Sequence, residues 1–392
     1  MGKIKQYVAK TLFGLENVLA SELETLGASD VKPANRAVLF TGNTELLYKV
    51  NYCVRTALSI LLPVNDFNIS SKEDLYLKAS AINWSEFMDN DTTFSVVPVV
   101  NSKIFQHTSY PGLIVKDAIA DFFRKKTGRR PYVDTHDPDL VINLHISNQR
   151  VNISLDSTVI PLYKRGYRAE HGKAPLNEVL AAGILMLSGW DGSLSLHDPM
   201  CGSGTLPVEA ALLAKNIPPG KFRQFFGFTK WKDFDEKLFT RVKEKSEKKI
   251  SNLQVRISAS DISREAVRQS FANFKRAGLE DVISLKVADF KDVTPQEDKG
   301  YLVFNPPYGQ RLNKIETDTL YPMIGSVLKH NFPGFKAWIL TSGKENLNKM
   351  GLKPGIKHTL FNGSLECILA GFEMYEGSRK KSDNRKSNEK DA

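Results

Sequence analysis

The sequence predicts an α/β protein in which a doubly wound parallel sheet follows a smaller α+β region. In the C-terminal half, four short strand patterns end in acidic or amide residues, namely Asp198, Asp261, Asp289 and Asn305. The order and spacing of these residues relative to a glycine turn at residues 202–204 indicate contacts to one nucleoside ligand. In the N-terminal half, short strand and helix patterns alternate, which is typical of helices packed on an antiparallel sheet.

The first predicted element is a strand within residues 4–13, followed after Gly14 by an amphipathic helix. Leucine and valine residues recur on that helix at helical spacing until Gly27, a typical helix end. The elements predicted after it are, in order, a strand near 38–40, a helix near 44–53, a strand at 57–63, a helix at 74–81, a strand at 93–100, a helix at 112–126 and hairpin strands at 141–146 and 151–156.

A glycine turn follows the strand that ends at Asp198, and an apolar helix of small residues follows the turn. Gly202 and Gly204 can adopt positive φ and let the backbone approach a ligand closely. The start of the helix presents free N–H groups. The turn lacks the Lys-Ser/Thr of a phosphate loop and the spacing of a dinucleotide fingerprint. Asp198 is placed to receive the ammonium group of a methionine-like ligand.

Two further strands end in carboxylates. The strand near 256–261 ends at Asp261, and a carboxylate at this point of a doubly wound sheet typically binds both ribose hydroxyls of a nucleoside cofactor. Ser263 has the residue type of a helix N-cap. The strand pattern at 283–290 contains Asp289, which could accept a hydrogen bond from the N6 amine of adenine.

The tetrapeptide Asn305-Pro306-Pro307-Tyr308 follows a short apolar run and is the most informative motif of the chain. Two consecutive prolines cannot donate backbone hydrogen bonds, so the strand must end there. The Asn305 side-chain oxygen and an adjacent free carbonyl can both accept from one planar NH2 group. Tyr308 can stack on the base that carries this group. The motif therefore predicts methylation of an exocyclic amine on a nucleobase, without distinguishing guanine from adenine.

The spacing Asp-x-x-x-Gly-x-Gly, the acidic strand ends and Asn-Pro-Pro-Tyr together resemble the class I S-adenosylmethionine-dependent methyltransferases that modify amino groups. Four segments also resemble the RNA methyltransferases that carry a THUMP domain, namely residues 162–168, 174–182, 305–312 and 362–367. Within that group the chain is most similar to the ribosomal large-subunit (23S) RNA guanine-N2 methyltransferases. The resemblance covers roughly residues 3–376.

The resemblance implies a Rossmann-like class I methyltransferase domain at residues 158–376. An α+β region is expected before it, with a ferredoxin-like part at 1–55 and a THUMP RNA-binding domain at 56–157. Residues 377–392 are rich in charged side chains with almost no apolar ones, so a disordered basic tail is expected there. The implied activity is methylation of the exocyclic N2 amine of a guanosine in RNA, with 23S ribosomal RNA favoured as the partner and transfer RNA as the alternative.

The resemblance also implies S-adenosylmethionine as the cofactor. The residues expected to bind it are Asp198, Met200, Gly202, Gly204, Thr205, Asp261, Ile262, Asp289, Phe290 and Asn305. The residues expected at the catalytic centre are Asn305, Pro306, Pro307 and Tyr308. Because the methyl group of the cofactor is already activated, the main task expected of the protein is to position the amine.

The charge balance favours a polyanionic partner. The chain has 54 Lys and Arg residues against 44 Asp and Glu, a formal net charge of +10, and basic clusters neutralise phosphates. One cluster near a predicted helix end consists of Lys116, Arg124, Lys125, Lys126, Arg129 and Arg130. A second cluster, at the expected domain junction, consists of Lys164, Arg165 and Arg168. The residues expected to stack on unpaired bases are Phe105, His107 and Tyr110.

Three cysteines, Cys53, Cys201 and Cys367, lie far apart and form neither a metal pattern nor a disulfide framework. The N-terminal residues lack an apolar signal segment, and no run approaches the roughly 20 apolar residues that a membrane helix needs. These features predict a cytoplasmic enzyme without a metal and without a membrane anchor. They do not indicate an oligomeric state.

Three interpretations compete. The first is a guanine-N2 methyltransferase of ribosomal RNA. The second shares this chemistry but acts on guanine in transfer RNA or on the N6 amine of adenine in DNA. The third is a non-catalytic RNA-binding factor for ribosome assembly that retains the fold. The basic N-terminal half favours RNA over DNA, and the intact set of motif residues argues against a factor without activity.

Overall fold

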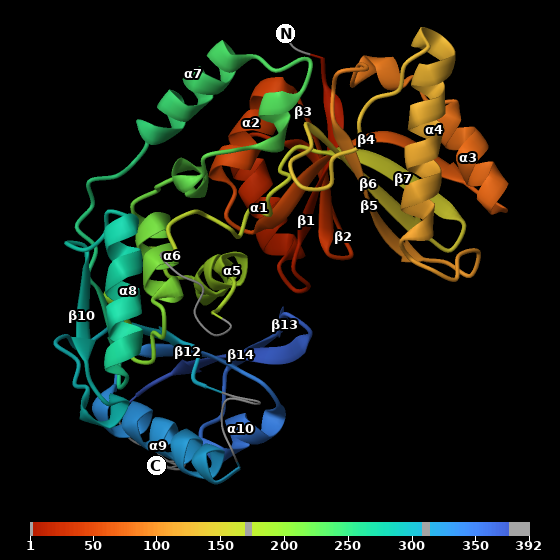
Figure 1. Ribbon diagram of the computed structural model, residues 1–392. Helices are drawn as coiled ribbons and strands as arrows, with labels where there is room; N and C mark the ends of the chain where they lie inside the picture. The colour runs from red at the N-terminus through yellow and green to blue at the C-terminus, as the bar shows by residue number, and fades with distance from the viewer. Residues whose placement is uncertain (1–2, 169–174, 308–313, 376–392) are drawn as a thin grey trace, which may run out of the picture. The chain divides into compact units, whose positions relative to one another are not determined.

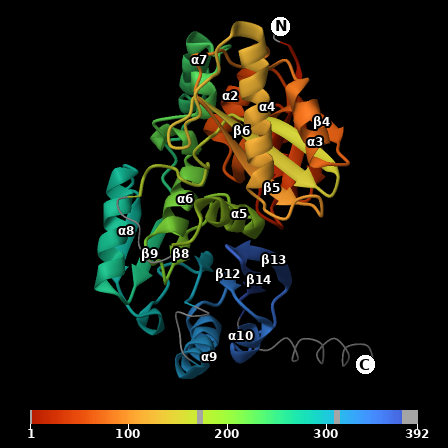
Figure 2. The same ribbon diagram turned by 45° about the vertical axis from the view of Figure 1, so that its right-hand side comes forward.

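The computed structural model describes residues 3–168, 175–307 and 314–375. The chain divides into two compact units, which are Met1–Gly166 with Pro218–Lys249 and Tyr167–Ile217 with Ile250–Ala392. Each unit is built around its own sheet (Figure 1; turned by 45° in Figure 2).

The first unit has a seven-stranded sheet in the order β2-β3-β1-β4-β7-β6-β5. Its strands are β1 (Lys5–Thr11), β2 (Ser29–Ala34), β3 (Ala37–Gly42), β4 (Ala57–Asn68), β5 (Phe94–Asn101), β6 (Leu140–Ser147) and β7 (Arg150–Asp156). Its helices are α1 (Glu16–Leu26), α2 (Thr44–Cys53), α3 (Lys72–Ser80), α4 (Tyr110–Thr127) and α7 (Glu236–Glu247), with 3-10 turns at Trp84–Glu86, Pro219–Phe222 and Gly227–Lys230. Neighbouring strands pair antiparallel except β5 and β6, which run parallel.

Most elements of this unit follow the sequence patterns. Helix α1 ends at Leu26, and Gly27 takes up the left-handed conformation with φ 100°. Strand β4, however, continues beyond Pro63, where the sequence predicts its end. Its register with β7 shifts between Pro63 and Asn65, and this bulge lets the strand accommodate a residue without an N–H. Strand β2 is absent from the prediction because its residues are mostly exposed and show no apolar alternation.

The segment Pro218–Lys249 belongs to the first unit, although the sequence-based boundaries place it in the methyltransferase domain. It contributes Phe228 and Phe239 to an aromatic cluster with Tyr48 of α2. The ring centroids of Tyr48 and Phe228 lie 4.5 Å apart, and those of Phe228 and Phe239 lie 5.0 Å apart. Such aromatic burial joins segments that are distant in the chain, so local patterns do not reveal it.

The second unit also has a seven-stranded sheet, in the order β10-β9-β8-β11-β12-β14-β13. Its strands are β8 (Leu196–Asp198), β9 (Ile257–Asp261), β10 (Ile283–Val287), β11 (Tyr301–Phe304), β12 (Lys336–Thr341), β13 (Ile356–Asn362) and β14 (Leu365–Glu373). Its helices are α5 (Glu178–Ser188), α6 (Thr205–Ala214), α8 (Arg264–Arg276), α9 (Lys314–Asn331) and α10 (Lys344–Lys349), with a 3-10 turn at Phe290–Asp292.

The strand order of this sheet indicates where a ligand would bind. Strands β10, β9, β8, β11 and β12 run parallel, and β14 extends the sheet by pairing antiparallel with both β12 and the edge strand β13. The chain proceeds outward from β8 to β9 and β10, then returns to the other side of β8 with β11. Ligands of doubly wound sheets bind at such a reversal, outside the carboxyl ends of the strands. The predicted Rossmann-like fold is confirmed, with α6 and the pair α9 and α10 on opposite sides of the sheet (Figure 1).

A partly buried histidine links two central strands of this sheet. His197 of β8 shares hydrogen bonds with the hydroxyls of Ser258 (Nδ1 to Oγ, 2.8 Å) and Ser260 (Nε2 to Oγ, 3.3 Å) of β9. Burial lowers the pKa of His197 from 6.5 to about 4, and the nearby Lys286 adds to this effect. The imidazole is therefore neutral at physiological pH, which suits a residue that shares hydrogen bonds between two neighbouring strands.

Acidification between pH 6.5 and 4 should destabilise the second unit through His197. The unfolded chain binds a proton in this window while the folded protein does not, so the stability present above pH 6.5 is lost as the pH falls. The expected loss is about 3 kcal/mol. Urea unfolding at pH 7 and pH 4.5 should show this difference in the wild type and a smaller one in His197→Gln. His330→Gln, at an exposed histidine of α9, is the matched control, and a pH response unchanged in His197→Gln would contradict the assignment.

Candidate active site

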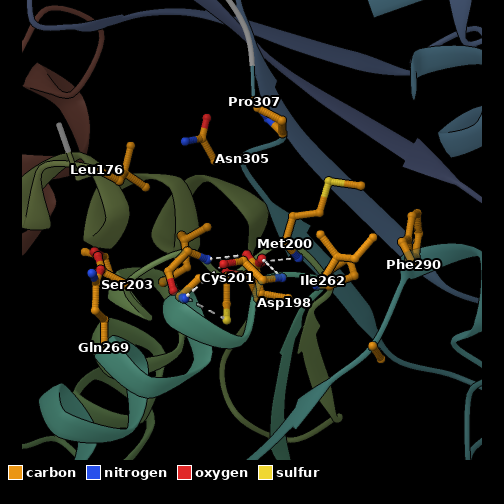
Figure 3. Close-up of a pocket in the computed structure, with 18 of the residues that line it drawn as sticks. Leu176, Asp198, Met200, Cys201, Ser203, Ile262, Gln269, Phe290, Asn305 and Pro307 are labelled. Carbon is orange, nitrogen blue, oxygen red and sulfur yellow. Dashed lines mark hydrogen bonds between the residues drawn. The ribbon is translucent and has the colours of Figure 1, made fainter. Parts of the chain in front are cut away.

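A cavity of about 720 Å³ lies at the carboxyl edge of the second sheet, where β8, β9, β10 and β11 end (Figure 3). The predicted cofactor-binding residues that line it are Asp198, Met200, Gly202, Thr205, Asp261, Ile262, Asp289, Phe290 and Asn305. These residues come from four separate strand ends, so the cavity brings together the acidic and amide positions that the sequence singled out. Gly204 is the one predicted cofactor residue that the lining does not include.

The two glycines of the turn have different roles. Gly202 has φ 54° and Gly204 has φ 77°, so both need the conformational freedom of glycine. A Cβ atom at Gly202 would meet no atom within 4 Å, whereas one at Gly204 would lie 2.5 Å from the Phe274 ring. Gly202 therefore faces the cavity, and Gly204 allows α6 to start against α8. Gly204 acts through packing, a distinction that the glycine spacing alone does not make.

Side chains from β9 and α8 fix the turn. The Gly202 N–H donates to Asp261 Oδ2 at 2.9 Å. The Ser270 hydroxyl donates to the Gly202 carbonyl at 2.7 Å, and the Asn273 amide donates to the Ser203 carbonyl at 2.9 Å. The shape of the turn is thus determined by its neighbours before any ligand binds, which lowers the cost of ordering a bound molecule.

Asp198 is a buried carboxylate, with 1% of its surface exposed. Its Oδ1 accepts a hydrogen bond from the Met200 N–H at 3.1 Å. Burial raises the pKa of Asp198 well above its usual value, and the negative charge of Asp261 adds to the shift. A cationic ligand group beside Asp198 would stabilise the charged form and reverse this shift. The chemistry of the site therefore fits an ammonium group.

The other predicted cofactor residues contribute both polar and apolar side chains to the cavity wall. Asp261 Oδ1 accepts from the Ser263 N–H at 2.9 Å, so its two oxygens organise both the glycine turn and the start of α8. Ile262 is 69% exposed and offers an apolar surface. Asp289 caps the following 3-10 turn and forms an ion pair with Lys291 at 3.2 Å. Phe290 is buried beside Phe304, so it supports the wall from the core.

Asn305 directly follows β11 and lies across the cavity from Asp198 and Met200 (Figure 3). Its Oδ1 is buried and has no hydrogen-bond partner among the described residues. An unsatisfied buried acceptor costs about 1–3 kcal/mol, so it is suited to a donor supplied by a ligand. Pro307 also lines the cavity, while Pro306 does not. Tyr308 lies outside the described residues.

The first predicted RNA cluster lies on the surface of the first unit. Arg124, Lys125 and Lys126 are in the last turn of α4, and Arg129 and Arg130 follow it; all five are exposed. Acidic residues offset part of this charge through the pairs Lys116–Asp117 (2.9 Å), Arg124–Asp121 (2.7 Å) and Arg129–Asp91 (2.9 Å). The cluster is therefore available to a polyanion but is weaker than its sequence suggests.

Sequence reasoning missed one aromatic residue beside this cluster and misjudged another. Tyr132, two residues after Arg130, is 72% exposed. Its carbonyl accepts from the Phe94 N–H at 3.1 Å, which holds the backbone at the start of β5. Phe105, predicted to stack on bases, is instead buried in the core of the unit. A buried ring in a loop has the same local sequence pattern as an exposed one, so only the tertiary structure separates them.

Two of the three side chains in the second predicted RNA cluster are largely inaccessible to solvent. Arg165 is 1% exposed, and its guanidinium donates to the carbonyls of Leu162 (2.9 Å) and Arg55 (2.6 Å). Arg168 forms a short ion pair with Glu178. Neither side chain presents its charge to a phosphate, which argues against the expected RNA contacts. Lys164 remains exposed.

Metal sites and membrane helices were both expected to be absent. Among the described residues, no group of three or more His, Cys, Asp and Glu side chains has an arrangement that could hold a metal ion. No helix in the described ranges combines the length and apolar character required to cross a membrane.

Sequence profiles of known families match three parts of the chain. The methyltransferase domain of RMKL-like proteins matches residues 165–370, a THUMP domain matches 70–156, and the RlmL ferredoxin-like domain matches 6–61. A Synechocystis protein, provisionally named an RNA methyltransferase, is 36% identical over 373 residues, covering 95% of this chain and 97% of the relative. The ribosomal RNA large subunit methyltransferase K/L of Psychromonas ingrahamii is 38% identical over 375 residues. That match covers 94% of this chain but only 50% of the relative, so the chain spans about half the length of this relative.

A solved structure supports S-adenosylmethionine as the cofactor. The crystal structure of SMU.472, provisionally named a methyltransferase and complexed with SAH (S-adenosylhomocysteine), superposes with a TM-score of 0.88 at 32% identity. The match covers 96% of this chain and all of SMU.472. Fold and cavity together define a class I methyltransferase whose cofactor is S-adenosylmethionine. The chain belongs to the RMKL-like methyltransferase family with THUMP and RlmL ferredoxin-like domains.

Proposed function

We propose that this protein transfers a methyl group from S-adenosylmethionine to the exocyclic N2 amine of a guanosine in RNA, with 23S ribosomal RNA the favoured substrate. The observation that carries the proposal is the buried Oδ1 of Asn305 at the cofactor cavity, which has no partner among the described residues. An acceptor in this place suits an NH2 donor on a base. The name of the K/L relative supports ribosomal RNA as the substrate class, and such a substrate would place the protein in the cytoplasm.

The proposed roles of the cofactor residues follow from their positions. Asp198 binds the ammonium group, and Asp261 binds the ribose hydroxyls from the end of β9. Ile262 covers one face of the adenine with its exposed side chain, and Asp289 accepts from the adenine N6 amine through an oxygen not used by its own cap. Gly202 lets the backbone approach the methionine part closely.

The proposed mechanism relies on placement. S-adenosylmethionine supplies an activated methyl group on a sulfonium. Asn305 Oδ1 and the Pro306 carbonyl each accept one hydrogen of the amine, which holds the nitrogen near the methyl group. These acceptors also stabilise the positive charge that develops on the nitrogen during transfer. Tyr308 stacks on the guanine, which must first leave its base stack at a cost of a few kcal/mol. The proton leaves after transfer, so no dedicated strong base is required.

The RNA is proposed to contact the exposed basic cluster at the end of α4, together with Tyr132. Phosphates bind the basic side chains, and an unpaired base stacks on the Tyr132 ring. The fixed backbone of Tyr132 reduces the entropy that the ring loses on binding, since only the side chain must be ordered. The buried guanidinium groups of Arg165 and Arg168 take no part in this binding.

Two substitutions should separate phosphate contacts from stacking. Arg130→Gln is expected to weaken RNA binding and to reduce the slope of log affinity against log salt by about 0.7–0.9, the value for one neutralised phosphate. Tyr132→Ala is expected to weaken binding by about 1–3 kcal/mol without changing that slope. RNA binding titrations at several salt concentrations measure both effects.

Lys237→Gln is the matched control for these substitutions, because Lys237 is an exposed lysine of the same unit that lies on α7. It should leave affinity and salt slope unchanged. Equal effects of Lys237→Gln and Arg130→Gln would show that only the overall charge matters, and would remove the α4 cluster from the proposed RNA surface.

Methyl transfer into separated nucleic acids tests the proposed function. The protein is incubated with methyl-labelled cofactor and with ribosomal RNA, transfer RNA or DNA from cells that lack it. Label in ribosomal RNA, recovered as N2-methylguanosine, is the expected result. Label in transfer RNA, or as N6-methyladenine in DNA, would contradict ribosomal RNA as the substrate but would still be methylation of an exocyclic amine. Absence of label in all three pools, with cofactor still bound, would favour an assembly factor.

A further inference from the structure

Arg168 is the second residue of the second unit and contacts residues that line the cofactor cavity. Its side chain is only 14% exposed. The guanidinium donates four hydrogen bonds, to Glu178 Oε1 at 2.5 Å, Leu176 O at 2.8 Å, Thr205 Oγ1 at 3.0 Å and Ser203 Oγ at 3.2 Å. One planar group thus joins the segment before α5, the first turn of α5 and the glycine turn.

Three of the four acceptor residues form the wall of the cavity. Leu176, Ser203 and Thr205 line it, whereas Glu178 does not. Ser270 and Asn273 of α8 hold the carbonyls of Gly202 and Ser203 in the same turn. The glycine turn is therefore held both by α8 and, through Arg168, by the segment at the start of α5.

We propose that Arg168 is a positioning residue of the cofactor site, which sets the geometry of the glycine turn by holding Ser203 and Thr205 against Leu176. The proposal rests on the cofactor site of the proposed function and adds a residue that contacts no substrate itself. It replaces the phosphate contact that the sequence suggested for Arg168.

Stability alone does not account for this arrangement. A buried Arg–Glu pair typically adds little over an apolar pair of the same size, because both ions lose their hydration. Burial raises the pKa of Glu178, and Arg168 opposes the shift by favouring the carboxylate. The guanidinium of Arg168 has a planar fork of donors that reaches several acceptors at once. A lysine ammonium is a single point and does not span them.

Paired variants separate positioning from simple charge neutralisation. Arg168→Met leaves Glu178 buried without its partner and is expected to destabilise the protein. The double variant Arg168→Met/Glu178→Gln removes that charge, so it should fold while Ser203 and Thr205 remain unheld. Glu178→Gln alone keeps the arginine and its contacts to the turn. Arg168→Lys keeps a cation for Glu178 but not the planar fork.

Calorimetric titration with SAH measures the effect on the full-length protein, independently of any RNA substrate. The double variant should bind SAH about tenfold more weakly or worse, while Glu178→Gln stays within about twofold of the wild type. Steady-state assays should show a raised KM for S-adenosylmethionine with a smaller change in kcat. Arg168→Lys should also bind SAH more weakly than the wild type.

Wild-type affinity for SAH in the folded double variant would overturn the proposal, because Arg168 would then serve only to neutralise Glu178. If the double variant does not fold, the SAH affinity of Arg168→Lys is decisive instead. Wild-type affinity in that variant would overturn the proposal. A wild-type protein that binds SAH but methylates no RNA would contradict the proposed function and leave the role of Arg168 standing, so the two failures are distinguishable.

Discussion

Asn305→Ala should abolish methyl transfer while the cofactor site stays intact. Loss of one preorganised hydrogen-bonding group at a centre of developing charge typically costs 10²–10³-fold in kcat, and Asn305 also positions the amine, so a fall of at least about this size is expected. The buried Oδ1 has no hydrogen-bond partner among the described residues. Its removal therefore breaks no hydrogen bond with any of them. Single-turnover methylation of RNA and titration with SAH measure the two properties separately.

Asn348→Ala provides the matched control, since Asn348 is an exposed asparagine on α10 of the same unit. It should turn over at the wild-type rate. Turnover by Asn305→Ala within about threefold of the wild type would contradict the proposed placement of the amine, because hydrogen-bonding groups at such centres are worth far more. A large loss of SAH affinity in this variant would instead assign Asn305 to cofactor binding.

Asp261→Ala should weaken cofactor binding roughly ten- to hundredfold, because it removes two kinds of charged hydrogen bond. Asp261 Oδ2 holds the Gly202 N–H at 2.9 Å, and the same carboxylate is proposed to bind the ribose. Its loss therefore loosens the glycine turn and deletes a ligand contact together. Titration with SAH measures the change, and kcat at saturating cofactor should fall much less than affinity.

Two further variants complete this test. Asp261→Asn keeps one oxygen that can accept from Gly202 and should lose less affinity than the alanine variant. Asp281→Ala, at an exposed aspartate of the same unit, should bind SAH normally. An unchanged dissociation constant in Asp261→Ala would remove Asp261 from the cofactor site.

The second unit could be predicted closely because its signals are local. Each strand from β8 to β11 is a short segment that ends at or just before a residue lining the cavity. The rule that ligands bind at the carboxyl ends of parallel strands then brings Asp198, Asp261 and Asn305 together without knowledge of side-chain packing. The same rule does not separate Gly202, which faces the cavity, from Gly204, which packs on Phe274.

The predictions that failed concern packing between distant segments. Charge in the sequence does not show that Arg165 is buried among carbonyls or that Arg168 supports the glycine turn. The sequence around an aromatic residue does not show whether its ring is buried in a core, as for Phe105, or exposed, as for Tyr132. The sequence-based domain boundaries stay a prediction, and Pro218–Lys249 shows how a segment can pack outside the range assigned to it.

The proposed N2 methylation can be tested in cells that lack this protein, by nucleoside analysis of large-subunit ribosomal RNA after restoring either the wild type or Asn305→Ala. One N2-methylguanosine should be missing in these cells, should return with the wild type and should not return with Asn305→Ala. Ribosomal RNA with the same N2-methylguanosine content in all three strains would contradict it.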